Sequence, residues 1–207
     1  MEELTLDFFS TSIHVWLFVN VKNAMALRNS LVEASRGGVK SEQERLDWAF
    51  LDASMITSRQ HLVTAVCQAL VTRLHGDLKT KTIHSEILWA LSPSTNIMDA
   101  IKKFGLGPRT TEILLVKLLP TNCSQPKDQL NQAALDLVEG QISDLNQLGH
   151  SLTKWNELKR LYKLNEDVVI KELDEKMKHK SNDSEREMHA MIDQLVVSTV
   201  ALKSVAG

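Results

Sequence analysis

The stretch that decides the fold spans residues 112–120 and reads EILLVKLLP. Its apolar run is short, and Pro120 ends it because proline cannot donate a hydrogen bond to a sheet. A short apolar run that stops at such a signal is typical of a strand buried on both faces. We therefore predict a central strand over residues 112–119.

Working outward, further strands and helices are predicted on both sides of this strand. Residues 13–19 read IHVWLFV and are rich in β-forming residues, so they predict a second strand. Residues 47–52 predict a short buried strand or extended segment. Apolar residues at helical spacing predict helices over residues 23–34, 58–74, 82–91 and 96–104. Weaker patterns predict helix at 130–137, strand at 138–142, helix at 152–162, and helix from 167 to 206 with a polar break at 181–184.

Length and composition describe an ordinary globular chain. Its 207 residues fit a single domain, 1–207, whose last part, 165–207, is helical. The net charge of −2 means that nucleic-acid binding would depend on a local patch. Two cysteines fit a reducing compartment, and the N-terminus lacks the pattern of a secretory signal. We expect a soluble intracellular protein that does not interact with membranes.

Catalytic patterns are missing from the sequence. It contains no Gly-rich phosphate loop and no paired cysteines, and its seven histidines are scattered. His84, Ser85 and Glu86 resemble a fragment of a catalytic triad, but adjacent helix positions point in different directions. The sequence therefore predicts neither catalysis nor a metal or cofactor site.

A local excess of positive charge lies between residues 73 and 109, where there are six basic and three acidic residues. Within it, Lys79 and Lys81 alternate with Thr80 and Thr82 just before a predicted helix. Free backbone N–H groups at a helix start, together with lysines and hydroxyls, suit a phosphate group. The alternative is an ordinary solvated loop, which the charges alone favour.

The predicted C-terminal helix, residues 185–204, is apolar on most of its circumference. Such a helix is expected to be buried on most sides, either within its own domain or against a partner. The residues alone leave these two alternatives open. They also leave open whether the isolated chain forms a weak homodimer through this helix.

Several short motifs occur together in a characteristic order. They read KTKT at 79–82, EI at 86–87, LSP at 91–93, NI at 96–97, AIKKFG at 100–105 and ILLV at 113–116. KNA at 22–24 and LYKL at 161–164 accompany them. In this order and spacing the chain resembles the PRPK-binding protein (TPRKB) family, a small subunit of the KEOPS (EKC) tRNA-modification complex.

The resemblance implies an α+β fold, with a mostly antiparallel sheet, packed helices and a C-terminal partner-binding helix. It implies a non-catalytic subunit that binds and supports a small atypical kinase. Through that kinase it would reach the subunit that synthesises threonylcarbamoyladenosine on tRNA. Some members of the family bind the single-stranded CCA end of tRNA, and the expected locations are the cytoplasm and the nucleus. A free-standing RNA-binding protein that shares the fold is the alternative.

The resemblance also assigns residues to two sites. The RNA-facing residues would be Lys79, Lys81, Thr82, Ser85, Asn96 and Lys102. The residues that contact the kinase would be Ile192, Leu195, Val196, Thr199 and Val200.

Overall fold

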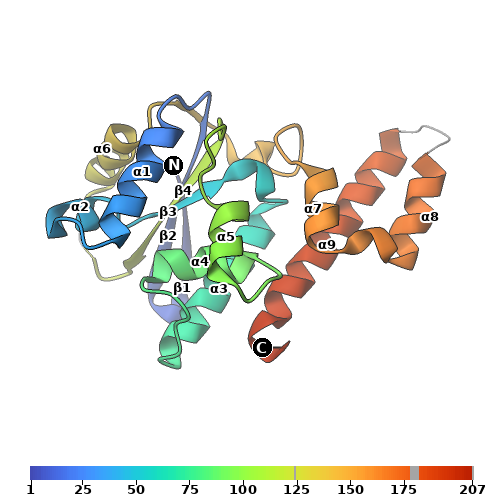
Figure 1. Ribbon diagram of the computed structural model, residues 1–207, viewed down its shortest axis with the longest axis horizontal. Helices are drawn as coiled ribbons and strands as arrows, with labels where there is room; N and C mark the ends of the chain where they lie inside the picture. Colours follow the sequence, from blue (N-terminus) through green and yellow to red (C-terminus); the bar gives the residue numbers. More distant parts are fainter. Residues whose placement is uncertain (124, 178–181, 207) are drawn as a thin grey trace.

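The computed structural model describes residues 1–123, 125–177 and 182–206. Within them, five strands form one antiparallel sheet: β1 (Glu2–Leu6), β2 (Thr11–Val19), β3 (Ala49–Asp52), β4 (Ile113–Pro120) and β5 (Gln141–Ser143). The order is β1-β2-β4-β3, and β5 pairs with the part of β2 that β1 leaves free. Figure 1 shows helices packed around this sheet. The predicted α+β class with an antiparallel sheet is confirmed.

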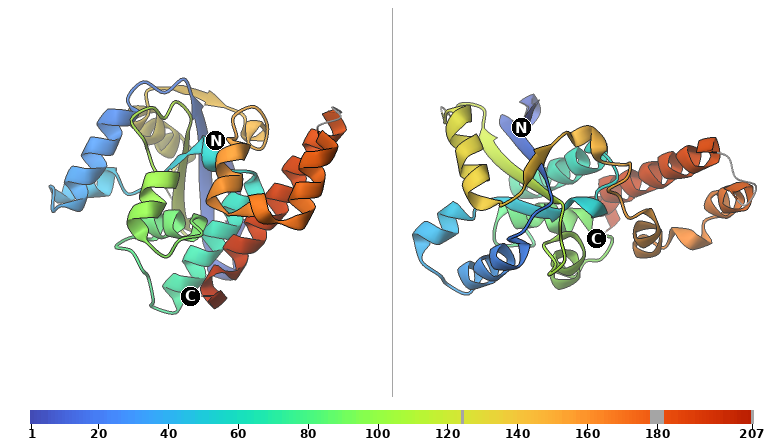
Figure 2. Two further views of the ribbon diagram at one scale, coloured as in Figure 1. Left: turned by 45° about the vertical axis from the view of Figure 1, so that its right-hand side comes forward. Right: turned by 90° about the horizontal axis from the view of Figure 1, so that it is seen from above.

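The sheet separates two layers of helices. One face is covered by α1 (Ala24–Ser35) and α6 (Lys127–Leu137), with α2 (Lys40–Arg45) beside α1. The other face carries α3 (Arg59–Leu74), α4 (Ile83–Leu91), α5 (Ile97–Phe104), α7 (Trp155–Leu161) and α9 (Asn182–Ala206). The right-hand view of Figure 2 shows the two layers on either side of the strands.

Alternation along the strands explains why both faces are apolar. In β2, Ile13, Val15 and Leu17 join the core on the α3 side. Trp16 and Phe18 join the core on the α1–α6 side, and all five are at most 1% exposed. Successive side chains of a strand point to opposite faces, so a strand covered on both sides needs an unbroken apolar run. That is the pattern by which β2 and β4 could be recognised from the sequence.

The C-terminal region forms a helical hairpin of α8 (Val168–Met177) and α9. The second half of α9 packs along α3, while α8 and the start of α9 extend away from the sheet (Figures 1 and 2). Helix α9 begins inside the predicted polar break at 181–184, and residue 181 lies outside the described residues. No helix among the described residues is both long and apolar enough to cross a bilayer.

Strand β5 begins three residues later than the predicted strand at 138–142, because Val138 caps the end of α6. Two further elements differ from the sequence prediction. Strand β1 was not predicted, because its alternating exposure at the sheet edge gives a weak apolar signal. Residues 40–45, for which the sequence predicts no helix, form the helix α2, which has no buried residue and so shows no apolar face. Both elements lack the apolar pattern from which an element is recognised.

Candidate nucleic-acid and partner interfaces

The loop before α4 is organised around a buried carboxylate. Glu86 is 0% exposed, and its side chain accepts the backbone N–H groups of Lys79 (3.3 Å) and Thr80 (2.9 Å). It also accepts the hydroxyl of Thr80 at 2.7 Å. A carboxylate that receives several hydrogen bonds fixes the groups that donate them. The loop that carries both predicted lysines is therefore held in one shape from inside.

The start of α4 is closed by a reciprocal cap between Thr82 and Ser85. The Thr82 hydroxyl accepts the Ser85 N–H at 3.1 Å, and the Ser85 hydroxyl accepts the Thr82 N–H at 3.2 Å. The predicted RNA-facing hydroxyls are therefore engaged in the capping box, which usually stabilises a helix start. The expectation of entirely free N–H groups at this terminus was wrong for the N–H of Ser85.

The predicted basic side chains point outward. Lys79, Lys81 and Lys102 are all exposed. Lys79 pairs with Asp77 at 2.7 Å, and the ammonium of Lys81 donates to the carbonyl of Ser35 at the end of α1 at 3.2 Å. Exposed lysines with such partners lose little by exchanging them for a phosphate, because surface pairs are weak.

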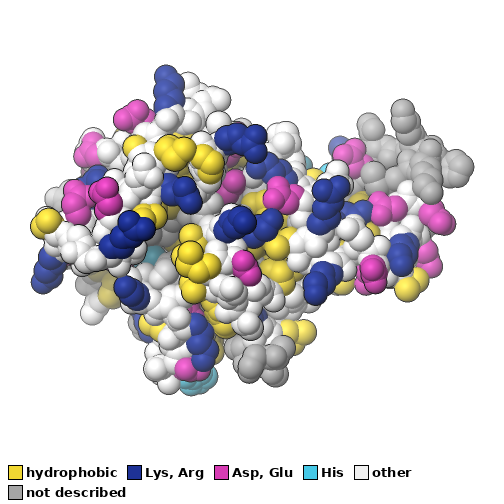
Figure 3. Space-filling model, viewed as in Figure 1, with side chains coloured by type: hydrophobic (Ala, Val, Ile, Leu, Met, Phe, Trp, Pro, Cys, Tyr) yellow, Lys and Arg dark blue, Asp and Glu magenta, His cyan; other side chains and the backbone are white. Residues whose placement is uncertain are grey.

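Asn96, another of the predicted RNA-facing residues, lies just beyond the C-terminal end of α4. Its side chain caps α5 by accepting the N–H of Met98 at 2.9 Å. The six predicted RNA-facing residues thus form two groups, one at the start of α4 and one along α5. On α5, Met98 is 69% exposed and Ile101 43% exposed, close in sequence to Lys102. Figure 3 shows apolar and basic side chains side by side on the face that carries α5.

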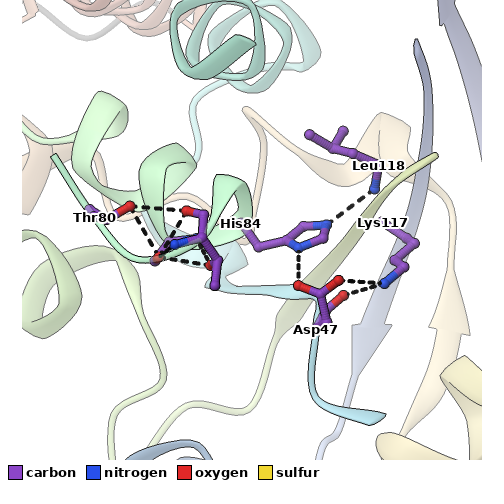
Figure 4. A network of polar contacts seen from close by, with 7 residues as sticks. Asp47, Thr80, His84, Lys117 and Leu118 are labelled. Carbon is purple, nitrogen blue, oxygen red and sulfur yellow. Dashed lines mark hydrogen bonds and ion pairs between the residues drawn. The ribbon is translucent and has the colours of Figure 1, made fainter. Parts of the chain in front are cut away.

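A polar network under α4, buried at His84 and partly open to solvent at Asp47, was not predicted (Figure 4). His84 is 3% exposed; its Nδ1 lies 2.8 Å from a carboxylate oxygen of Asp47, and its Nε2 accepts the N–H of Leu118 at 3.3 Å. The ammonium of Lys117 lies 3.1 Å from the other oxygen of Asp47. Both ring nitrogens of His84 are therefore occupied, and the imidazole fastens α4 to β4 and to the residues before β3.

The pKa values of Asp47 and His84 are both lowered, for different reasons. The hydrogen bond from His84 holds the pKa of Asp47 well below its usual range, helped by the positive charge of Lys117 and opposed by burial. Burial lowers the pKa of His84, and Asp47 acts against that change. His84 is therefore neutral near pH 7, with its proton on Nδ1 facing Asp47. The network positions a helix, and sequence reasoning missed it because its members are 34 to 70 residues apart.

The predicted partner stripe on α9 lies mostly inside the chain's own core. Ile192, Val196 and Val200 are at most 1% exposed and belong to the core that α3 and α4 also line. Leu195 is partly buried, and Thr199 is exposed. In the isolated chain, these three residues are therefore packed in their own domain, which is one of the two alternatives for this helix. A kinase contact by this helix stays a prediction, and its accessible side is marked by Thr199 and by Leu202, which is 60% exposed.

An open groove of about 900 Å³ lies between α5, α7 and α9. On its floor the rings of Trp155 and His189 stack with centroids 4.2 Å apart and an angle of 8° between their planes. Its lining carries both charges: Lys103, Lys154 and Arg160 against Glu157 and Glu185. This mixture does not favour one class of ligand. No group of three or more His, Cys, Asp or Glu residues suited to a metal occurs in the part of the chain that the structure describes.

Comparison with known proteins identifies the family of the chain. Residues 18–204, most of the chain, match the family model described as "Kinase binding protein CGI-121". The chain belongs to the CGI-121 kinase-binding protein family. The matched residues include β4, the α4–α5 region and α9 up to its last described turns, so both candidate interfaces lie within the family's common part.

Individual relatives agree with this family. The EKC/KEOPS complex subunit CGI121 of Gibberella zeae is 31% identical over 99% of both chains. The subunit of the same name from Kluyveromyces lactis is 33% identical over 64% of this chain and 76% of its own. The Aspergillus fumigatus subunit cgi121 is 38% identical, but that similarity spans only about half of each chain, 53%.

Proposed function

We propose that this chain is a non-catalytic subunit of an EKC/KEOPS complex, which binds and supports the small atypical kinase of that complex. The observation that carries the proposal is the family match over residues 18–204, together with relatives that are named as subunits of this complex. Through the kinase, the chain would be connected to the subunit that makes threonylcarbamoyladenosine. It would take part in tRNA modification by holding partners rather than by reacting with substrate.

The exposed side of α9 is the kinase-binding surface that we favour. Thr199 and Leu202 lie there at the exposed edge of the helix face that Ile192, Val196 and Val200 bury in the core. A helix fixed by that burial presents the exposed edge without losing further conformational freedom on binding, which favours affinity. Leu195, partly buried, lies along the same edge as Thr199 and Leu202 and would contribute to the same contact.

Calorimetric titration of the chain with the kinase tests this surface. The variant to compare is Thr199→Arg with Leu202→Asp, and the matched control is Leu135→Asp on α6, where Leu135 is 45% exposed on the other side of the sheet. We expect binding by the wild type and the control, and a loss of about 30-fold or more in the α9 variant. Absence of binding by the wild type would contradict the kinase half of the proposal.

The second half of the proposal is recruitment of tRNA through its single-stranded CCA end. Support comes from the two groups of residues around α4: basic side chains at Lys79, Lys81 and Lys102, and exposed apolar side chains at Met98 and Ile101. Proteins that bind single strands combine a basic track for phosphates with flat or apolar surfaces for bases. The loop of Lys79 is fixed by Glu86, so its lysines would meet the RNA in a set arrangement.

Fluorescence anisotropy with a labelled RNA oligonucleotide that ends in CCA tests this half. The variant Lys79→Glu with Lys81→Glu should bind more weakly, and the slope of log affinity against log salt should fall by about 0.7 for each lost phosphate contact. The control Lys40→Glu with Lys171→Glu changes the net charge equally on α2 and α8, and we expect it to bind like the wild type. Equal salt slopes in the two double variants would contradict the assignment of Lys79 and Lys81 to an RNA-binding surface.

A free-standing RNA-binding protein remains the second candidate, because the basic and apolar side chains around α5 do not themselves require a kinase. The two functions differ in the kinase titration. RNA binding without kinase binding would favour the free-standing protein.

A further inference from the structure

One lysine near the end of α9 is bound by the turn between α4 and α5. The ammonium of Lys203 donates to the carbonyl oxygens of Trp89, of Ser92 at 2.5 Å and of Ser94 at 3.0 Å. It also lies over the ring of Trp89, 3.8 Å from the centroid. More than 100 residues of sequence separate Lys203 from the groups that it binds.

The turn that Lys203 holds connects α4 to the predicted RNA-facing helix α5. It spans residues 92–96 and ends at Asn96, which caps α5. The indole N–H of Trp89 donates to the carbonyl of Thr95 at 3.1 Å. Three carbonyls of this short turn are therefore bonded: those of Ser92 and Ser94 accept from Lys203, and that of Thr95 accepts from Trp89. The ammonium of Lys203 also packs over the ring of Trp89. Removal of the ammonium would leave the carbonyls of Ser92 and Ser94 without this donor, whereas the carbonyl of Trp89 would still accept the N–H of Ser92 at 3.2 Å.

Burial and a neighbouring charge act on the ammonium of Lys203 in opposite directions. Burial lowers the pKa of Lys203 to about 8, and the negative charge of Glu86 acts in the opposite direction. The amine is therefore mostly protonated near pH 7, when its three donors match the three carbonyls. Carbonyls at the C-terminal end of a helix also favour a cation, because the helix dipole is negative there.

Helix α9 is firmly attached to the rest of the core, so Lys203 connects two well-defined bodies. Val196 and Val200 fix the helix from within, and the side-chain amide of Gln68 on α3 donates to the carbonyl of Ala201 at 2.6 Å. The turn, by contrast, makes short-range bonds of its own: the hydroxyl of Ser94 accepts the N–H of Asn96, and the hydroxyl of Ser92 accepts the N–H of Ser94, both at 3.1 Å. Lys203 joins this local structure to α9.

We propose that Lys203 is a positioning residue through which α9 sets the shape of the turn from Ser92 to Asn96, so that a partner bound to α9 is sensed at α5. This inference rests on the proposed function, since it joins the proposed kinase surface to the proposed RNA surface. It assigns no role to Lys203 in touching either partner.

Hydrogen exchange of the amides of Ser94 and Asn96 tests the positioning without any partner. In Lys203→Met we expect these amides to exchange about tenfold faster than in the wild type, because the charge-assisted bonds that hold the turn are lost. Lys203→Arg keeps a charged multiple donor and should restore most of the protection. The loop around Thr80 is the internal control and should not change. Unchanged exchange in Lys203→Met would overturn the proposal.

Addition of the kinase tests the communication between the two surfaces. In the wild type, the kinase should slow exchange at Ser94 and Asn96, whereas in Lys203→Met it should bind with similar affinity and leave the turn unchanged. If the kinase binds the wild type without changing the exchange of Ser94 and Asn96, the proposed coupling between α9 and the turn would be contradicted. If the wild type binds no kinase, the proposed function fails, and the partner-free exchange of Lys203→Met still decides whether Lys203 positions the turn.

Discussion

The loop before α4 and the helix α9 are stabilised by different kinds of contact. The loop is stabilised locally, since Glu86, Thr82 and Ser85 bond with groups at most seven residues away. Helix α9 is stabilised from a distance, since its apolar residues bury against elements far away in the sequence. A polar cluster at a helix start can therefore be interpreted from its sequence neighbours, whereas an apolar helix can be interpreted only once the elements that pack against it are known.

The largest effect should come from breaking the packing of α9. Val196→Asp places a carboxylate without a partner at a position that is 0% exposed, and we expect a loss of about 4 kcal/mol in the free energy of unfolding. Ser198→Asp, on the exposed side of the same helix, should change it by less than about 0.5 kcal/mol. Thermal and urea unfolding measure both variants. Equal stabilities would contradict the placement of α9.

A smaller effect should follow from the loss of the charge that organises the loop. Glu86→Gln keeps the size of the side chain but weakens the bonds from Lys79 and Thr80, so we expect a loss of about 2 kcal/mol. Glu33→Gln, an exposed acid on α1, is the matched control and should be nearly neutral. Urea unfolding gives both values, and a neutral Glu86→Gln would mean that the loop is held by other bonds.

A third stability effect is a dependence on pH that arises in the core. His61 is fully buried, accepts the N–H of Thr57 at 3.3 Å and lies 3.3 Å from the hydroxyl of Tyr162. Burial lowers its pKa from 6.5 to about 3. The unfolded chain therefore binds a proton here that the folded chain excludes, so stability should fall as the pH decreases below about 6.5.

The size of this pH effect can be stated for a limited window. Between about pH 6 and pH 4.5, one excluded proton lowers the free energy of unfolding by up to about 1.4 kcal/mol per pH unit. The pKa values of His14, His84 and His189 are also lowered and act in the same direction. His61→Gln should flatten the slope measured by urea unfolding across this window. A slope equal to that of the wild type would show that His61 does not resist protonation.

Much of the fold could be predicted from the sequence because its main signals are local. The unbroken apolar runs of β2 and β4 need covering on both faces, and Pro120 closes β4. Ser58, Thr82 and Asn96 cap α3, α4 and α5 as their residue types suggest. The family resemblance followed from the same α4–α5 region, and the comparisons confirm it.

What could not be predicted depends on residues that are distant in the sequence. The pairing of Asp47 with His84 and the contact of Lys203 with Ser92 have no sequence signal, because only the folded chain brings them together. The apolar residues of α9 satisfied the pattern for a core helix and for a partner helix equally. The burial of Ile192, Val196 and Val200 depends on the packing of α9 against α3, which the sequence does not show.

Hydrogen–deuterium exchange of the chain, alone and with the kinase or a CCA-ending RNA, would map both proposed surfaces in one experiment. We expect the kinase to protect the end of α9 around Thr199, and the RNA to protect residues 79–85 and 96–102. In both cases α1 and α6, on the other face of the sheet, should exchange as in the free chain. Protection of α1 and α6 instead, with no change in α9 or in the α4–α5 region, would contradict both proposed surfaces.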